Sequence, residues 1–153
     1  MSFSHAADPA HLRETLEAAG WRWTRQRQAV YEFLVRSNPH HPTAEEVFHA
    51  VQAELPRISL ATVYKALETL EAAGLVTRLA AVGDGPARFD ARLEPHYHLR
   101  CLKSGRVDDL PTPFDPALIA RLDPELDRRL EERGFKVTGY RLELVGYYQT
   151  RGG

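Results

Sequence analysis

The sequence predicts an α+β protein with an N-terminal winged helix-turn-helix domain and a small C-terminal α/β dimerisation domain. Amphipathic helical segments followed by two short strands in residues 1–90 have the order of elements of a winged helix. After a linker at 91–95, residues 96–153 combine strand-like and helix-like segments. This second unit is too small to bury much core alone. We therefore expect it to complete its core against a second copy of the chain.

The segment from Ser59 to Gly74 organises the first domain. Ser59 suits a helix N-cap after Pro56, and Gly74 suits the left-handed residue just past a helix end. Apolar residues recur with helical spacing at Val63, Ala66, Leu67 and Leu70. The other side carries Thr62, Tyr64, Lys65, Glu68 and Thr69. Such a helix is suited to a DNA major groove, although an ordinary surface helix would show the same periodicity.

The earlier helices of the first domain have start signals of their own. Asp8-Pro9 predicts an N-cap and first turn, and Thr24 caps a second helix. Thr43 to Glu46 forms a capping box that opens a third helix reaching Leu55. The apolar positions of these helices are Leu12, Leu16, Ala19, Ala29, Val30, Phe33, Leu34, Val47, Phe48 and Val51.

Strand-like segments lie between glycine or proline turns. They are expected at 75–81, 86–90, 96–101, 106–110 and 135–148. The first two form a hairpin around Gly83-Asp84-Gly85, which is the wing of the first domain. Asp-Pro pairs further along predict helices at 117–122 and 125–133.

Composition and charge limit the class of protein. Apolar residues make up 43% and charged residues 27%, as in globular proteins. There is no membrane-length apolar run and no signal-peptide pattern, so we expect a cytoplasmic protein without a membrane partner. The net charge is −1, so DNA binding must depend on local clusters, such as the arginines at 22, 25, 27 and 36.

His96-Tyr97-His98 places two imidazoles on one face of a strand, because side chains alternate with a period of two. Such a pair can bind one metal ion, or it can be two surface residues. His41, Asp90 and Asp109 could join it, which gives three imidazoles and two carboxylates without a thiolate. That set suits Fe²⁺ or Mn²⁺ better than a structural zinc ion. Spacing alone does not show that the five groups converge.

Several runs together resemble the Fur superfamily of metal-responsive repressors, and most closely its peroxide-sensing branch. They are Gly20-Trp-Arg-Trp-Thr-Arg-Gln-Arg27, His41-Pro-Thr-Ala-Glu-Glu46, Ile58-Ser-Leu-Ala-Thr-Val-Tyr-Lys65, Gly74-Leu-Val76, Arg88-Phe-Asp90 and His96-Tyr-His98. The resemblance covers nearly the whole chain. It implies a homodimeric repressor, not an enzyme, that binds palindromic operator DNA when loaded with metal. Such a repressor controls metal homeostasis or a peroxide response.

The resemblance also assigns residues. It implies one regulatory divalent metal per subunit, Fe²⁺ or Mn²⁺ with Zn²⁺ able to substitute, on His41, Asp90, His96, His98 and Asp109. In the peroxide-sensing branch a histidine that holds iron is oxidised, and His41 and His96 occupy the matching positions. The implied DNA contacts are Arg22, Ser59, Thr62, Tyr64 and Lys65.

From these assignments we infer a hinge. The ion ties the two domains together and sets the distance between the recognition helices. Ligation requires neutral imidazoles, so DNA binding should weaken below about pH 6.

One departure from the family is plain. Most members have two C-x-x-C pairs that bind a structural zinc, but the matching stretches here read Cys101-Leu-Lys-Ser104 and Tyr147-Tyr148-Gln149-Thr150. We expect no four-cysteine zinc site, packing of Tyr147 and Tyr148 against the partner subunit, and a buried Cys101 that is not a redox sensor. Three alternatives stay open: a zinc sensor of the same family, a His/Asp metalloenzyme, and a winged-helix regulator without metal.

Overall fold

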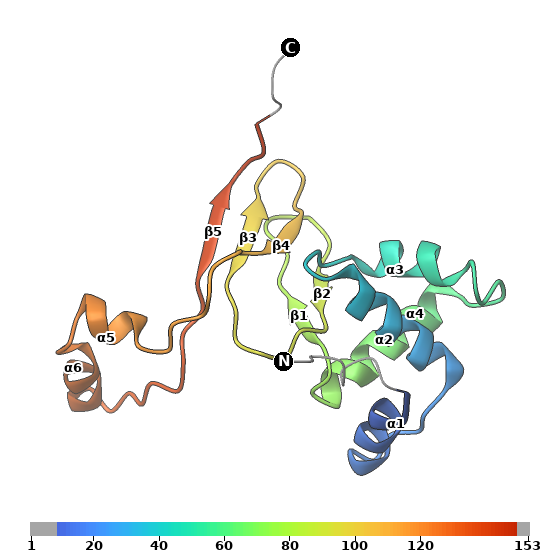
Figure 1. Cartoon of the computed structure of the whole chain (residues 1–153), viewed down its shortest axis with the longest axis horizontal. Helices are drawn as coiled ribbons and strands as arrows, with labels where there is room; N and C mark the ends of the chain where they lie inside the picture. Colours follow the sequence, from blue (N-terminus) through green and yellow to red (C-terminus); the bar gives the residue numbers. More distant parts are fainter. Residues whose placement is uncertain (1–8, 150–153) are drawn as a thin grey trace.

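The structure, a computed structural model, describes residues 9–149 as two parts joined by a short linker (Figure 1). The N-terminal part has four helices followed by an antiparallel hairpin, as a winged helix-turn-helix requires. Its elements are α1 (Pro9–Ala18), α2 (Arg25–Ser37), α3 (Ala44–Val51), α4 (Leu60–Ala72), β1 (Thr77–Leu79) and β2 (Arg88–Asp90). The N-cap expected at Asp8 lies outside the described residues. Within 9–149, no helix is both long and apolar enough to cross a bilayer.

Three helices begin at the side-chain caps that the sequence predicts. In each, a threonine or serine hydroxyl accepts a hydrogen bond from a first-turn backbone N–H that has no partner within the helix. The bonds join Thr24 to Arg27 N (3.1 Å), Thr43 to Glu46 N (3.2 Å) and Ser59 to Thr62 N (3.1 Å). Local sequence therefore determines where α2, α3 and α4 start.

Helix α3 ends earlier than its apolar pattern predicts. We expected it to reach Leu55, but it stops at Val51. The backbone N–H groups of Ala53 and Glu54 bond to carbonyls three residues back, at 3.4 and 3.0 Å. These tighter turns lead the chain to Pro56, which cannot continue a helix.

The four helices enclose one apolar core, in which α4 contacts both α2 and α3. Its largest fully buried side chains include Tyr31, Leu12, Leu16, Leu34, Leu67 and Leu70. Burial of one large apolar side chain stabilises the fold by roughly 1.5–3 kcal/mol. Thr69 was expected on the polar side of α4 and is buried instead, because a helix that contacts two others buries a wider face.

The C-terminal part is a three-stranded sheet with two short helices. Its elements are β3 (His98–Cys101), β4 (Val107–Asp109), α5 (Leu118–Leu122), α6 (Leu126–Glu132) and β5 (Glu143–Gly146). The strand order is β4-β3-β5, with β3 antiparallel to β4 and parallel to β5. Helices α5 and α6 lie apart from the sheet in Figure 1, and none of their residues is buried.

The strands are shorter than the sequence predicts. Residues 135–148 were expected as one strand, but only Glu143–Gly146 pairs with β3. The stretch 135–142 carries the chain from α6 back to the sheet, and none of it belongs to a strand. The first strand of the wing is also reduced, from 75–81 to Thr77–Leu79. Strand length depends on a neighbouring strand, which local sequence does not reveal.

Residues 39–43, in the loop before α3, connect the two parts of the chain. Backbone hydrogen bonds join this loop to β2 on one side and to β4 on the other. They are Phe89 N to Pro42 O (3.0 Å), Asp109 N to Pro39 O (2.9 Å) and His41 N to Val107 O (3.2 Å). The loop is therefore hydrogen-bonded both to the wing and to the C-terminal sheet. His41 lies at the junction where these two parts of the chain meet.

Candidate metal centre

Five side chains with metal-binding groups meet at this junction. They come from the loop before α3 (His41), the end of β2 (Asp90), the approach to β3 (His96), the start of β3 (His98) and the end of β4 (Asp109). One ligand atom from each lies within 4.8 Å of those of the other four. The β3–β4 ladder contributes directly, because it pairs His98 with Asp109. We refer to these five residues as the junction centre.

The carboxylates of the junction centre lie among its imidazoles. Asp90 Oδ2 lies 2.7 Å from His96 Nε2 and 3.0 Å from His98 Nε2. Asp109 Oδ1 lies 2.6 Å from His41 Nε2 and 3.2 Å from His96 Nε2. The side chains of His41 and Asp90 are 0% and 2% exposed, so water has little access to this side of the centre.

The charges of these groups stabilise one another. Burial alone would raise the pKa of Asp90 and of Asp109. Hydrogen bonds from the facing imidazoles outweigh burial and hold the pKa of both carboxyls well below the usual range. The pKa of His96 rises to about 10, first because its imidazole donates to Asp109 and then because it donates to Asp90. Without a metal ion, the centre therefore holds ionised carboxylates around a protonated imidazole.

The residues of the junction centre fit a divalent cation with nitrogen and oxygen ligands. Three imidazoles and two carboxylates without a thiolate suit Mn²⁺ or Fe²⁺. His41 Nδ1 is buried without a hydrogen-bond partner, 3.6 Å from Asp90 Oδ1. A buried polar atom without a partner is costly and rare in folded proteins, and a cation bound by this nitrogen would satisfy it.

The raised pKa of His96 predicts how metal binding depends on pH. A histidine must lose its proton to bind a metal, so the carboxylates that hold this proton oppose the ion. We expect Mn²⁺ affinity to rise steadily between about pH 6 and about pH 9, a higher range than an unperturbed histidine gives. Calorimetric titrations in buffers of different ionisation enthalpy measure both affinity and proton release. An affinity that stops rising above about pH 7 contradicts the prediction.

The raised pKa of His96 also makes the stability of the metal-free fold depend on pH, but in the opposite direction to metal affinity. Because the folded pKa of His96 exceeds its unfolded value, the group contributes stability that is fully present below about pH 6.5. That contribution is lost as the pH rises through about 10. Raising the pH therefore strengthens metal binding while it weakens the metal-free junction.

Arg92, in the linker, contacts the junction centre from outside. Its Nη1 donates to Asp109 Oδ2 at 3.1 Å, while Asp109 Oδ1 faces the imidazoles. Its Nε donates to Glu94 Oε2 at 3.2 Å. Sequence reasoning missed this residue. Its position two residues after Asp90, a predicted metal ligand, was the available signal.

Replacing Arg92 with glutamine should strengthen Mn²⁺ binding by about three- to tenfold. The change removes a positive charge beside the cation and leaves the two carboxylates less compensated when no ion is bound. Solvent screening limits the gain, because the Arg92 side chain is 39% exposed. Calorimetric Mn²⁺ titration measures it, and Arg92→Lys, which keeps the charge, is the matched control. Weaker binding by Arg92→Gln would show that the guanidinium supports the ion instead of opposing it.

The residues named for DNA contact lie at the start of α4 and before α2. Ser59 and Thr62 form the N-cap of α4, with their hydroxyl oxygens 2.9 Å apart. Tyr64 is 40% exposed, and its hydroxyl donates to a glutamate of α3 at 2.9 Å. Lys65 and Arg22 are exposed. Ser59, Thr62, Tyr64 and Lys65 thus lie at the N-terminal end of α4, whereas Arg22 precedes α2.

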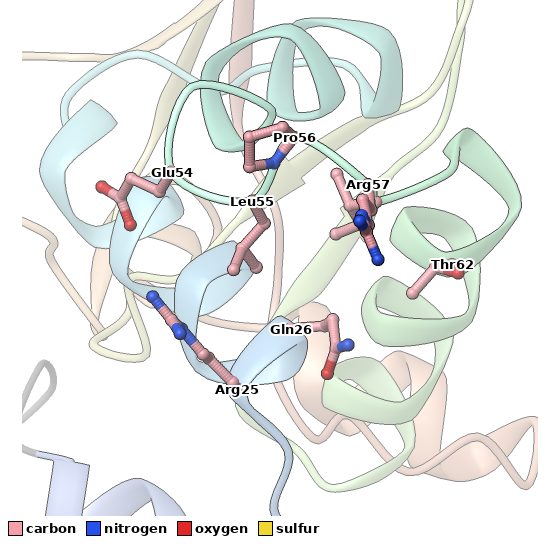
Figure 2. A pocket seen from close by; sticks show the side chains of 8 residues that line it. Arg25, Gln26, Glu54, Leu55, Pro56, Arg57 and Thr62 are labelled. Atoms are coloured by element: carbon pink, nitrogen blue, oxygen red, sulfur yellow. The ribbon is translucent and has the colours of Figure 1, made fainter.

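A surface pocket of about 410 Å³ lies beside these residues, between the starts of α2 and α4 (Figure 2). It is lined by Arg25, Gln26, Glu54, Leu55, Pro56, Arg57, Ile58 and Thr62. Arg25 and Arg57 lie on either side of Gln26 in Figure 2, and both are exposed. Sequence analysis placed Arg25 in a basic cluster but missed Arg57. Its place just before the α4 N-cap was a usable signal, because helix N-termini attract phosphate.

Cys101 is buried in β3, as expected. Hydrogen bonding by Ser104 is the main cause that lowers the pKa of its thiol to about 7. In the part of the chain that the structure describes, the junction centre is the only group of three or more His, Cys, Asp or Glu side chains that could hold a metal. Cys101 is therefore not part of a metal cluster there.

Comparisons with known proteins agree with this architecture. The ferric uptake regulator family matches residues 18–145. The peroxide operon regulator of Bacillus subtilis is 38% identical over 136 residues, which cover 89% of this chain and 88% of that protein. Among solved structures, a zinc-bound manganese uptake regulator has a TM-score of 0.63 at 30% identity, covering 90% of this chain and 98% of the other. The Campylobacter jejuni peroxide stress regulator has a TM-score of 0.60 at 28% identity, covering 94% and 97%.

These relatives are regulators and not enzymes, so the metalloenzyme alternative is wrong. The chain has the helical N-terminal unit, the wing and the small C-terminal sheet that the sequence predicts for a metal-responsive regulator. It therefore belongs to the ferric uptake regulator family.

Proposed function

We propose that this chain is a dimeric repressor that binds palindromic operator DNA when the junction centre holds one Fe²⁺ or Mn²⁺ per subunit. The observation that supports this most strongly is the approach of all five metal-binding side chains to within 4.8 Å of one another. His41 and Asp90 come from the winged helix, and His96, His98 and Asp109 come from the C-terminal part. An ion held by all five fixes one part of the chain against the other.

The proposed hinge is the linker at 91–95, between a DNA-binding domain at 1–90 and a dimerisation domain at 96–153. Leu93, Glu94 and Pro95 are exposed and belong to no helix or strand, so these linker residues themselves offer little resistance to a change of angle. The ion binds the closed arrangement more tightly than an open one. By linkage, metal and DNA then raise each other's affinity, by about 5- to 150-fold in typical couplings.

Fe²⁺ and Mn²⁺ are the proposed ions because the junction centre offers imidazoles and carboxylates without a thiolate. A zinc-responsive repressor is the second candidate. The name of the zinc-bound manganese uptake regulator favours Zn²⁺ as a substitute ion. The name of the Bacillus subtilis relative favours a peroxide response as the process controlled.

We propose that the C-terminal part pairs with a second copy of the chain. Large apolar side chains exposed in this part are Leu102, Leu122, Phe135, Val137, Leu144 and Val145. Exposed apolar side chains that gather into one surface mark a protein–protein interface in many soluble proteins. A two-fold axis through this part would present two α4 helices to half-sites about one helical turn apart.

In the proposed complex, α4 enters the major groove. Ser59, Thr62, Tyr64 and Lys65 face the bases or the adjoining phosphates, and Arg22 reaches the minor groove. Arg25 and Arg57 add phosphate contacts, which supply affinity without sequence specificity. Tyr64 must exchange its bond to α3 for a contact with DNA.

The test is DNA binding with and without the ion. A pool of random DNA duplexes selected with Mn²⁺-loaded protein identifies the operator. Affinity for that operator is then compared in Mn²⁺ and after chelator treatment at one ionic strength, because salt alone changes it strongly. We expect at least about tenfold weaker binding without metal. Equal affinity in the two conditions contradicts the proposal and favours a regulator that uses no metal.

A further inference from the structure

The C-terminal edge of the sheet does not fit the structural zinc of the resembled family. The stretches 101–104 and 147–150 contain one thiol, Cys101, and no imidazole. A structural zinc ion requires four thiolate or imidazole ligands in most proteins. The ends of β3 and β5 from which these stretches continue nevertheless lie side by side, because Leu102 N donates to Gly146 O at 2.7 Å and continues the β3–β5 ladder. Other side chains must therefore hold this edge.

In the second stretch, Tyr147 stands at the first cysteine position of the resembled pair, and Tyr148 is the residue that follows it. The Tyr148 hydroxyl donates to Asp108 Oδ2 at 2.5 Å, and Arg106 Nε lies 2.9 Å from the same oxygen. The Arg106 guanidinium also lies over the Tyr148 ring, 5.2 Å from its centroid. Similarly, Lys103 Nζ lies 4.2 Å from the Tyr147 ring centroid. Both tyrosines make these contacts within their own chain and stay 57% and 50% exposed, so their packing against the partner subunit stays a prediction.

Asp108 connects Tyr148 to the N-terminal part of the chain across the junction. Its Oδ1 is hydrogen-bonded to His40 Nδ1, in the loop before α3. The Asp108 side chain is only 8% exposed, and the backbones of the two residues form a β-bridge. The next residues along the two segments are His41 and Asp109, whose side chains are themselves 2.6 Å apart. The Tyr148–Asp108–His40 link therefore lies one residue away from the junction centre.

We propose that Tyr148 is a positioning residue that acts through Asp108 and His40 to hold the loop before α3 against β4. The link keeps the register that brings His41 to the junction centre. It also ties the C-terminal strand to the sheet without zinc. A carboxylate that is bonded on both oxygens has a restricted orientation, and partners of this kind commonly orient metal ligands. The inference rests on the proposed metal site.

Tyr148→Phe tests the link, because it removes the hydroxyl and keeps the ring under Arg106. We expect Mn²⁺ affinity to fall by about three- to tenfold. Tyr147→Phe is the matched control, since it keeps the ring beside Lys103, and it should bind Mn²⁺ as the wild type does. Hydrogen exchange of the metal-free proteins gives a second readout. Tyr148→Phe should exchange faster at the amides of His41 and Asp109, which bond across the junction, and at the wild-type rate in α4.

Wild-type Mn²⁺ affinity in Tyr148→Phe, with unchanged exchange at these two amides, overturns the positioning role. His40→Gln breaks the same link from the other side and replaces Tyr148→Phe if that variant does not fold. His96→Ala lacks a ligand of the junction centre, so zinc that it retains must be bound elsewhere. One zinc ion retained per chain in this variant overturns the proposal that the C-terminal strand is held to the sheet without zinc. A wild-type protein that binds neither Mn²⁺ nor Fe²⁺ overturns the proposed function instead, and the exchange rates then still decide the link.

Discussion

Asp90→Asn should abolish Mn²⁺-dependent DNA binding. Asp90 is 2% exposed, and its Oδ2 lies within 3.0 Å of the Nε2 atoms of His96 and His98. Asparagine keeps the shape of the side chain but offers one uncharged oxygen to the ion. We expect Mn²⁺ affinity to fall by more than about 100-fold, because even residues that only orient a metal ligand are worth about 10- to 100-fold. Without the ion, the coupling that favours DNA binding is lost as well.

Calorimetric Mn²⁺ titration and fluorescence anisotropy on the selected operator measure these two losses. Circular dichroism verifies that the variant is folded, since Asp90 also bonds to the imidazoles without metal. His49→Ala is the matched control, because it removes an exposed imidazole of α3 outside the junction centre. A folded Asp90→Asn protein with wild-type affinity for Mn²⁺ would exclude Asp90 from the metal site.

Hydrogen peroxide should release operator DNA from protein loaded with Fe²⁺ and leave protein loaded with Mn²⁺ bound. One oxygen atom of the peroxide is added to the imidazole of His41 or His96, and the other leaves as water. When bound, iron supplies the redox chemistry for this reaction. The His41 and His96 ring centroids are 6.3 Å apart, so both rings are close enough to contact one ion. An oxidised ligand weakens the metal site, and DNA affinity should fall by at least about tenfold.

Mass spectrometry of the digested protein locates the added oxygen. We expect it on the peptide containing His41 or the one containing His96, in the Fe²⁺-loaded sample only. His49 serves as an internal control, because its exposed imidazole should stay unmodified in the same sample. Equal release of DNA from the two metal-loaded forms, or oxidation spread over exposed histidines, would contradict a peroxide sensor and favour a sensor of metal concentration.

Local signals in the sequence predicted most of the N-terminal fold. Helices α2, α3 and α4 start at the predicted caps, because a cap needs only a hydroxyl and a backbone N–H a few residues away. The apolar stripe of α4 was also predicted, since helical periodicity is a local property. The end of α3, the burial of Thr69 and the short β5 were not predicted. Each depends on a neighbouring turn, helix or strand, which the pattern of one segment does not specify.

The sequence by itself determined the chemistry of this protein: three imidazoles and two carboxylates without a thiolate, and a polar helix face beside a wing. Only the tertiary structure decided that these ligands meet. His41 and Asp109 are 68 residues apart in the chain, yet their side chains are 2.6 Å apart. The contacts of Arg92 with Asp109 and of Tyr148 with Asp108 also appeared only in three dimensions. The physical reason is that spacing along the chain specifies the face of one strand, whereas convergence requires backbone bonds from the loop before α3 to both β2 and β4.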